Sequence, residues 1–250
     1  MFRNARKMVR FRLSTLLVIL AVAAIWMALI SNRARNQQLA IAWLQSQGAT
    51  VRMDWQFIRE QGIDRFIGKS NHSPPGPTWI RRRLGDDYFQ TVIGIEGSIE
   101  DLQRISCLTE LRWLNLRNSQ LANIEELAHF RRLERLTLCN TQVSDISPLR
   151  DSVRLESLHL TGSPVEDLSA LTHASELQEL GLNGTDVIQL DSLPQLPKLR
   201  ILHVDRVQLT ELEPFHNMAS LTQLRIHDNT ISDDELASIR ASLPHLMVSR

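Results

Sequence analysis

The sequence predicts an α/β solenoid with one transmembrane helix near its amino end, and three observations lead to this fold class. Leucine recurs every 22 residues from Leu111 to Leu243. An apolar segment without charged side chains lies between two groups of arginines close to the amino end. The sequence contains no motif of a catalytic or phosphate-binding loop. A fixed period of this length indicates stacked supersecondary units, each too small to bury its own apolar face.

The 22-residue period is carried by six apolar columns. Counted from Leu111 as offset zero, they are offsets 0, 3, 5, 10, 13 and 16, and seven repeats begin with the one at Phe89. Of the 42 positions, 40 are apolar, whereas the 43% apolar content of the chain would give about 18 by chance. The exceptions, Gly94 and Asp234, fall in the first and last repeats, where the end units of a stack are atypical.

Each repeat is expected to hold one short strand and one helical turn. Offsets three to five alternate apolar and polar residues, which predicts short parallel strands lining the concave side. Eight strands, counting a final half-repeat strand marked by Leu243, Leu246 and Val248, would span about 34 Å. Offset 12 is polar in every repeat and is Asp in four of seven. We expect it to accept backbone N–H groups at the start of a short helical or 3-10 turn on the convex side. In the last repeat, Asp233 is expected to begin a longer helix.

The frame L-x-x-L-x-L-x-x-[N/T/S]-x-L at this period resembles the leucine-rich repeats of the internalin and phosphatase-regulator types. The resemblance implies a ladder in which an Asn side chain of each repeat bonds the neighbouring backbone. Here the usual residue occurs at Asn229, whereas the other repeats carry Ser119, Thr141, Ser163, Thr185 and Val207. Ser and Thr can make such bonds one at a time, but Val207 cannot, which puts the ladder in doubt at that repeat.

The amino end predicts a membrane anchor. Residues 1–12 form a basic tail, and residues 13–32 carry no charge. As a helix, the 18 residues from Leu13 to Ile30 would span about 27 Å. Five basic side chains before the segment and two after it, Arg33 and Arg35, favour a cytoplasmic amino end and extracytoplasmic repeats. The alternative is a signal peptide cleaved near residues 21–23, which would leave the equally apolar residues 24–30 unused.

Residues 33–88 are predicted to be a membrane-proximal segment and amino-terminal cap for the solenoid at 89–250. We expect a helix at Gln37–Gln47 that ends at Gly48, and a strand over Val51–Trp55. A loop is expected at Ser70–Pro77, followed by a short helix at Trp79–Leu84 that covers the core of the first repeat.

Two phrases of this segment carry a further resemblance. The run RARNQQLAIAWL from Arg33 and the phrase LGDDYF from Leu84, between an anchor and the repeats, are similar to the anchored leucine-rich repeat proteins of planctomycete bacteria. The resemblance implies an architecture and a location, not an activity.

The net charge of zero divides unevenly along the chain. Residues 1–35 carry seven basic and no acidic side chains, whereas residues 89–250 carry 14 basic and 23 acidic ones, a net −9. An acidic solenoid argues against a nucleic-acid partner. The basic run Arg81–Arg83 is interpreted as a solvated helix face, with contact to lipid headgroups as the alternative. Cys107 and Cys139 fall on different walls of the coil, so we expect no disulfide.

The outward strand positions, at offsets two, four and six, define the expected binding face. These columns include Ile93 and Ile95 in the first repeat and His245 in the last. The candidate partner-binding residues are Trp113, Arg135, Asn115, Arg117, His159, His203, Arg225 and His227. Trp and Arg are frequent anchors of protein interfaces, although contact with an adjacent loop would also explain Trp113. The spacing of the histidines does not predict a preformed metal site, and we predict no catalytic residue and no cofactor.

These features predict a membrane-anchored, non-enzymatic scaffold that binds a protein through its concave sheet. The alternatives are an envelope structural or glycan-binding protein and, if the topology is reversed, a cytoplasmic regulator. The sequence specifies neither the partner nor the oligomeric state.

Overall fold

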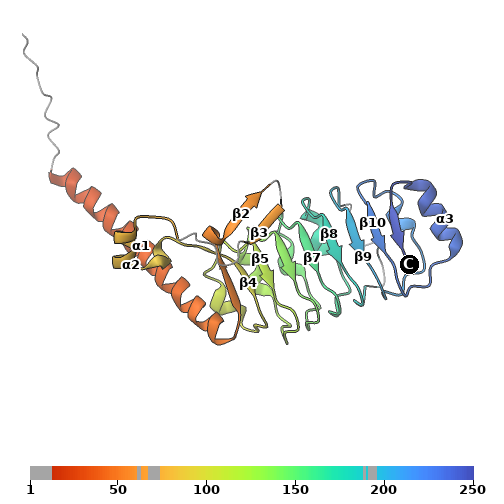
Figure 1. Cartoon of the computed structure of the whole chain (residues 1–250), viewed down its shortest axis with the longest axis horizontal. Helices are drawn as coiled ribbons and strands as arrows, with labels where there is room; N and C mark the ends of the chain where they lie inside the picture. Colours follow the sequence, from red (N-terminus) through yellow and green to blue (C-terminus); the bar gives the residue numbers. More distant parts are fainter. Residues whose placement is uncertain (1–12, 61–62, 67–73, 188–189, 191–195) are drawn as a thin grey trace, which may run out of the picture.

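The computed structural model describes residues 13–60, 63–66, 74–187, 190 and 196–250. A long helix leads into an elongated stack of turns, with one continuous sheet running the length of the stack (Figure 1). The sheet has nine strands in the order β1-β4-β5-β6-β7-β8-β9-β10-β11, of which the last eight are parallel. The strands are β1 (Thr50–Met53), β4 (Val92–Glu96), β5 (Trp113–Asn115), β6 (Arg135–Thr137), β7 (Ser157–His159), β8 (Glu179–Gly181), β9 (Ile201–His203), β10 (Gln223–Arg225) and β11 (Met247–Ser249). The eight parallel strands are those predicted, whereas β1, which pairs antiparallel with β4, adds an edge strand.

The opposite side of each coil is made of short turns. They are η3 (Leu102–Ile105), η4 (Glu125–His129), η5 (Ser147–Leu149), η6 (Ser169–His173) and η8 (Glu213–Phe215), followed by the helix α3 (Asp233–Ser242). The expected role of offset 12 is confirmed where Asn123, Asp145 and Asp167 accept the backbone N–H two residues later at 2.7–2.8 Å. Asp101 differs because its carboxylate pairs with Arg104 at 3.0 Å instead. Gln189 of this column lies outside the described residues.

The leucine columns form one core that runs through all the turns. The zero-offset leucines from Leu111 to Leu243 are all buried, and Phe130 and Phe215 add two fully buried rings. Because a strand turns alternate side chains to opposite faces, Leu114, Leu136, Leu158, Leu180, Leu202 and Leu224 stack behind the sheet in register. Each turn therefore buries the apolar face of its neighbour.

The spacing of the strands is constant in the centre and changes at both ends. Successive strands from β5 to β10 pair at a step of 22 residues, but Gly94 pairs with Trp113, a step of 19, and Gln223 pairs with Met247, a step of 24. The predicted register of the first repeat is therefore wrong by three residues. Ile93 and Ile95 are buried, and Ile95 pairs with Leu114, so neither lies on the concave surface. Gly94 is a concave position and not a defect in a core column.

The last step is longer because α3, with ten residues, replaces a short turn. Ser232 caps it by accepting the N–H of Glu235 at 3.2 Å, and the predicted helical start at Asp233 is confirmed. The extra length moves the final strand, so His245 precedes β11 and is not in the expected concave column.

The backbone adopts a left-handed conformation at the same position after each central strand. The residue at offset seven has a positive φ in each turn from Asn118 to Asp228, with values between 53° and 70°. The residues are Asn118, Asn140, Gly162, Gly184, Arg206 and Asp228. Gly and Asn adopt this conformation most readily, so Arg206 is the costliest member of the row. Gln208, two residues later, also has φ of 55°.

The ladder of short side chains is present at most of the expected positions. Hydroxyls of Ser119, Thr141 and Thr185 donate to the carbonyl three residues earlier at 2.7–3.0 Å. At Val207 the bond comes from the next turn, because Asn229 Oδ1 accepts the N–H groups of Val207 and Leu209, both at 3.1 Å. The Val207 side chain itself makes no hydrogen bond, as expected, and Asn229 of the next turn supplies the bonds to this backbone.

The amino-terminal helices differ from the expectation. A single helix, α1 (Leu13–Ser46), runs without a break through Arg33 and Arg35. It is long and apolar enough to cross a membrane. Its residues from Thr15 to Leu29 are exposed on every side, and from Ile30 a stripe of buried or partly buried residues begins. The helix ends before Gly48, which has φ of 74°, as predicted.

The cap over the first repeat comes from α1 and not from the helix at residues 78–84. Ala40 and Leu44 of α1, with Ala49 before β1, belong to the core cluster. The short helix α2 (Thr78–Leu84) exists, but none of its residues is buried, and Trp79 is 68% exposed. The prediction that it covers the core is therefore wrong, because the 34-residue α1 already occupies that end of the stack.

Three smaller elements complete the segment before the repeats. They are η1 (Asp54–Gln56), η2 (Asp86–Tyr88) and a hairpin of β2 (Phe57–Glu60) and β3 (Ile63–Phe66), which was not predicted. The predicted strand is present as β1, but it ends at Met53 and Trp55 lies in η1. Both cysteines are free, as expected.

Candidate binding face

The concave surface is built from two rows of outward-facing strand residues. One row runs Trp113, Arg135, Ser157, Glu179, Ile201, Gln223, and the other runs Glu96, Asn115, Thr137, His159, Gly181, His203, Arg225. Neighbours in a row belong to adjacent strands, which lie about 4.8 Å apart. Because of this register, residues that are 22 apart in the sequence lie next to each other on the surface of the sheet.

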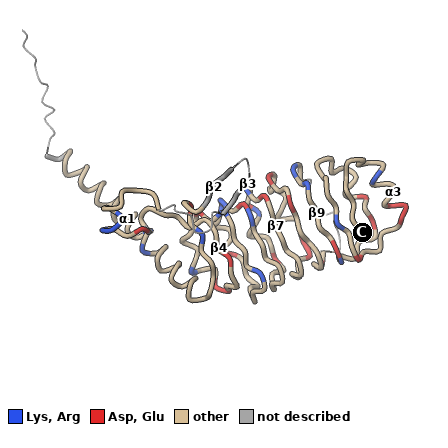
Figure 2. Tube along the Cα trace, viewed as in Figure 1, with Lys and Arg blue, Asp and Glu red and all other residues tan. Residues whose placement is uncertain are grey.

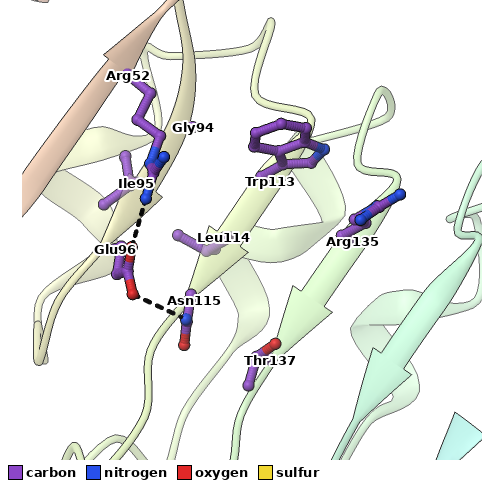
Figure 3. A pocket seen from close by; sticks show the side chains of 9 residues that line it. All are labelled: Arg52, Gly94, Ile95, Glu96, Trp113, Leu114, Asn115, Arg135 and Thr137. Carbon is purple, nitrogen blue, oxygen red and sulfur yellow. Dashed lines mark hydrogen bonds and ion pairs between the residues drawn. The ribbon is translucent and has the colours of Figure 1, made fainter. Parts of the chain in front are cut away.

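A pocket of about 280 Å³ lies at the amino-terminal end of this surface (Figure 3). The Arg135 guanidinium carbon stands 5.8 Å from the centre of the Trp113 ring, a cation–π distance. Trp113 lies against Gly94, where an added Cβ would stand 3.6 Å from the indole and 3.3 Å from Arg52 Cβ. The tighter of these two approaches is to Arg52, so the absence of a side chain at Gly94 chiefly leaves room for Arg52 of β1.

The polar side of the pocket is partly paired. Arg52 of β1 donates to Glu96 at 2.8 Å, and Asn115 Nδ2 donates to the other oxygen of Glu96 at 3.4 Å. Asn115 Oδ1 is buried and accepts no hydrogen bond from the described residues. Arg135 is exposed and takes part in none of the ion pairs found in the described part of the chain. The pocket therefore offers a guanidinium over an aromatic ring, beside a buried oxygen acceptor.

A second hollow of about 380 Å³ shares Arg135 with the first. Its walls alternate in charge, with Glu156 and Glu179 facing Arg135 and Arg200. The two hollows form one continuous strip from β1 to β10.

Two histidines lie on either side of a glycine in the middle of the sheet. His159 and His203 both pair with Gly181, and a Cβ at Gly181 would stand 2.6 Å from His159 Nδ1. His159 Nε2 lies 3.4 Å from Glu179 Oε1. Burial, and next the Arg225 guanidinium, hold the pKa of His203 below its usual value, so this imidazole is neutral near pH 7. Its Nε2 is buried without a hydrogen bond among the described residues.

The carboxyl-terminal part of the face is organised by Asp205, which the sequence did not single out as a site residue. Asp205 is 5% exposed and accepts from Arg225 Nη2 at 2.6 Å and from the backbone N–H of His227 at 2.9 Å. Its own N–H donates to Asn183 Oδ1 at 2.8 Å. The useful signal was an Asp at offset six, two residues after His203, which ends β9.

The structure brings some of the candidate residues together and separates others. Trp113, Asn115 and Arg135 line one pocket, together with Arg52 and Glu96. Sequence reasoning missed Arg52 because β1 was not expected in the sheet, and Glu96 because the register of the first repeat was wrong by three residues. His159, His203 and Arg225 share the second row. Arg117 and His227 lie beyond their strands and line neither hollow. In the described residues, no group of three or more His, Cys, Asp or Glu side chains is placed to hold a metal ion.

Comparisons with known proteins agree with this geometry. Residues 131–173 match the leucine-rich repeat family in its two-copy form. Internalin C2 of Listeria monocytogenes shares 29% identity with a TM-score of 0.59, over 66% of this chain and 74% of its own. A leucine-rich repeat protein of Leptospira interrogans shares 26% identity with a TM-score of 0.55, over 62% of this chain. This chain spans 41% of that protein's length.

The chain therefore has a leucine-rich repeat solenoid fold, and residues 131–173 match the model of that family. No curated protein matches its sequence. The resemblance to anchored planctomycete proteins stays a prediction.

Proposed function

We propose that this chain is a membrane-anchored scaffold that captures a protein partner on its concave face and does no chemistry of its own. Leucine-rich repeat proteins are typically binding scaffolds, because a stack of turns offers a long rigid surface. The observation that carries the proposal is the amino-terminal pocket, in which Trp113 and Arg135 are presented side by side on a sheet.

The chemistry of that pocket favours one kind of partner segment. A guanidinium that makes no ion pair within the described chain binds carboxylates in a two-pronged geometry, and an aromatic face beside it accepts apolar groups. The buried Asn115 oxygen would accept an N–H from the partner. A loop or strand carrying an acidic side chain next to an apolar one satisfies all three groups.

Anchoring is supported by the way α1 changes along its length. Its first half is apolar and exposed on all sides, which is stable in lipid but not in water. Its second half is fixed to the first turns through Ala40 and Leu44. Cleavage near residues 21–23 would leave Ile25, Trp26 and Leu29 on an exposed helix, so we propose that the span is retained. The arginine distribution supports a cytoplasmic amino end.

Glycan binding has less support. Polysaccharide sites usually stack sugars on several aromatic rings, but Trp113 is the single aromatic side chain on the outward face of the described nine-stranded sheet.

Site-specific photocrosslinking in the native cell tests the proposal. A photoreactive residue at Thr137, on the floor of the pocket, should crosslink a protein, and the same residue at Arg154 should not. The double variant Trp113→Ala/Arg135→Ala should reduce the crosslink and the affinity for the captured protein at least tenfold, or about 1.4 kcal/mol.

The matched control is Val153→Ala/Arg154→Ala, which removes an exposed apolar side chain and an arginine outside the concave rows. Both double variants should keep the melting temperature of the parent. Equal affinity of parent and Trp113→Ala/Arg135→Ala for the captured protein would exclude this pocket as the binding site.

A further inference from the structure

The short helix α2 lies beside the middle of α1, at the level where the apolar surface of α1 ends (Figure 1). Side chains of α1 are exposed from Thr15 to Leu29, and Ile30 is the first that is partly buried. Ala34 and Gln37 are buried one and two turns later. The element η2 packs on α1, and α2 packs on η2. The folded part of the chain therefore begins at about the position of Ile30 along α1.

That position coincides with the expected surface of the bilayer. The apolar part of α1, from Leu13 to Leu29, is about 25 Å long at 1.5 Å per residue. This length is close to the hydrocarbon thickness of a membrane, about 30 Å. With α1 in the bilayer, α2 is held at the level of the lipid headgroups.

The side chains of α2 divide into an inner and an outer set. Arg81 faces inward, where its Nε donates to Asp86 at 2.9 Å and its Nη1 donates to the carbonyl of Pro74. Trp79 and Leu84 are 68% and 51% exposed, and Arg82 and Arg83 are exposed as well. None of the ion pairs among the described residues includes Arg82 or Arg83.

Arginines outnumber acidic residues at this level, where the exposed Asp86 of η2 is paired with Arg81. Arg33 and Arg35 of α1 are also exposed, and Figure 2 shows blue segments together with red beside the middle of α1. The acidic side chains of the solenoid lie further from the span (Figure 2). Tryptophan is enriched at membrane interfaces, and arginine pairs with lipid phosphates.

We propose that α2 is a second membrane contact: an interfacial helix that inserts Trp79 and Leu84 at headgroup level and binds anionic phospholipid through Arg82 and Arg83. The proposal rests on the proposed anchoring by α1. A span alone leaves the helix free to tilt and to rotate about its own axis, whereas a second contact beside it fixes both. Because α1 is continuous with the cap of the solenoid, α2 would set the direction in which the concave face points.

Depth-dependent fluorescence quenching tests this directly. The full chain carrying Trp26→Phe, which removes the tryptophan of the span, is placed in vesicles of phosphatidylcholine with 30% phosphatidylglycerol. Lipids brominated near the headgroup should quench its tryptophan emission, and lipids brominated at the chain end should quench it much less. A second substitution, Trp79→Phe, should abolish the shallow quenching.

Charge reversal tests the headgroup contact. Arg82→Glu/Arg83→Glu in the Trp26→Phe background should lower the shallow quenching at least twofold. The control Arg131→Glu/Arg154→Glu makes the same change of charge on exposed solenoid positions and should leave the quenching unchanged.

Two different failures can be told apart. If the chain stays with the vesicles through an alkaline carbonate wash but its emission is not quenched by either lipid, α2 does not touch the membrane and the inference is wrong. If the wash releases the chain, the anchoring itself is wrong, and the inference falls with it.

Discussion

The central turns of the solenoid and its two ends are built differently. From β5 to β10 each strand follows the previous one after 22 residues, whereas the step into β5 is 19 and the step into β11 is 24. In the centre each turn packs between two turns of the same design. At the ends one neighbour is missing, and α1, β1 and α3 take its place. The comparison shows that the repeated sequence specifies how each turn packs on the next, whereas non-repeated segments are needed to cover the two ends of the stack.

The largest expected effect is the loss of unfolding free energy when a buried leucine is replaced, which can be compared between the centre of the stack and its amino-terminal end. Leu158 in the centre and Leu44 on α1 both have 0% exposure. Leu158→Ala should lower the free energy of unfolding by about 2–5 kcal/mol, because the turns on both sides keep the cavity from collapsing. Leu44→Ala should fall at the lower end of that range, since α1 packs on one side only and can adjust.

Urea unfolding of the full chain in detergent micelles, followed by circular dichroism, measures both changes. Hydrogen exchange should accelerate in β1 and β4 alone for Leu44→Ala, but across the whole sheet for Leu158→Ala. Equal acceleration everywhere in both variants would show that the ends and the centre unfold as one unit.

A smaller effect is expected where one long side chain serves two turns. Asn229 accepts from Val207 and Leu209 and donates to the carbonyls of Val204 at 2.7 Å and Ile226 at 3.0 Å. Asn229→Ala should cost about 1–3 kcal/mol, because backbone groups inside the stack lose their partners. Ser119→Ala, which removes one local bond to Leu116 O, should cost about 1 kcal/mol. Equilibrium urea unfolding at fixed pH checks the order, and a larger loss in Ser119→Ala would contradict it.

The smallest effect is a dependence on pH at a convex turn. The backbone N–H of Ser169, and next its hydroxyl, donate to Asp167 and lower the pKa of this carboxyl below its usual value. A lowered pKa in the folded state means that the ionised group stabilises the fold above the ordinary aspartate pKa. This contribution is lost as the pH falls through the lowered value.

The urea midpoint of the parent should therefore exceed that of Asp167→Asn at neutral pH, and the difference should shrink on acidification. Asn keeps an acceptor for the backbone N–H, so the variant isolates the charge and the hydroxyl contact. A difference that grows toward low pH would have the wrong sign for this mechanism.

Much of the fold could be predicted because the same sequence pattern occurs in every repeat. The columns through Leu111 and Leu114, the eight parallel strands and the polar caps at Asp145 and Asp167 follow from a pattern that seven repeats reinforce. The row of positive φ values from Asn118 to Asp228 had a weaker signal, the Asn and Gly residues at offset seven. Arg206 and Asp228 hide that signal, because the neighbouring turns impose the conformation on them.

The ends and the candidate face were less predictable because they depend on single contacts. Arg52 reaches Glu96 only through the antiparallel pairing of β1, and Asp205 orients Arg225 across two strands. The register error of three residues moved Ile95 to the wrong side of the sheet. An end strand of the stack pairs with only one repeat strand, so the segment on its other edge also determines its position. That segment occurs once in the sequence, so no repeated pattern predicts where it packs.

The amino-acid sequence by itself determined the period, the composition of the core and the length of the apolar helix. These features depend on the positions of apolar side chains, which the hydrophobic effect removes from water. The tertiary structure decided how the stack ends, which side chains meet on the concave sheet, and where α2 lies relative to α1. Those outcomes depend on packing between segments far apart in the chain, and the spacing of residues along it does not encode the distance between them.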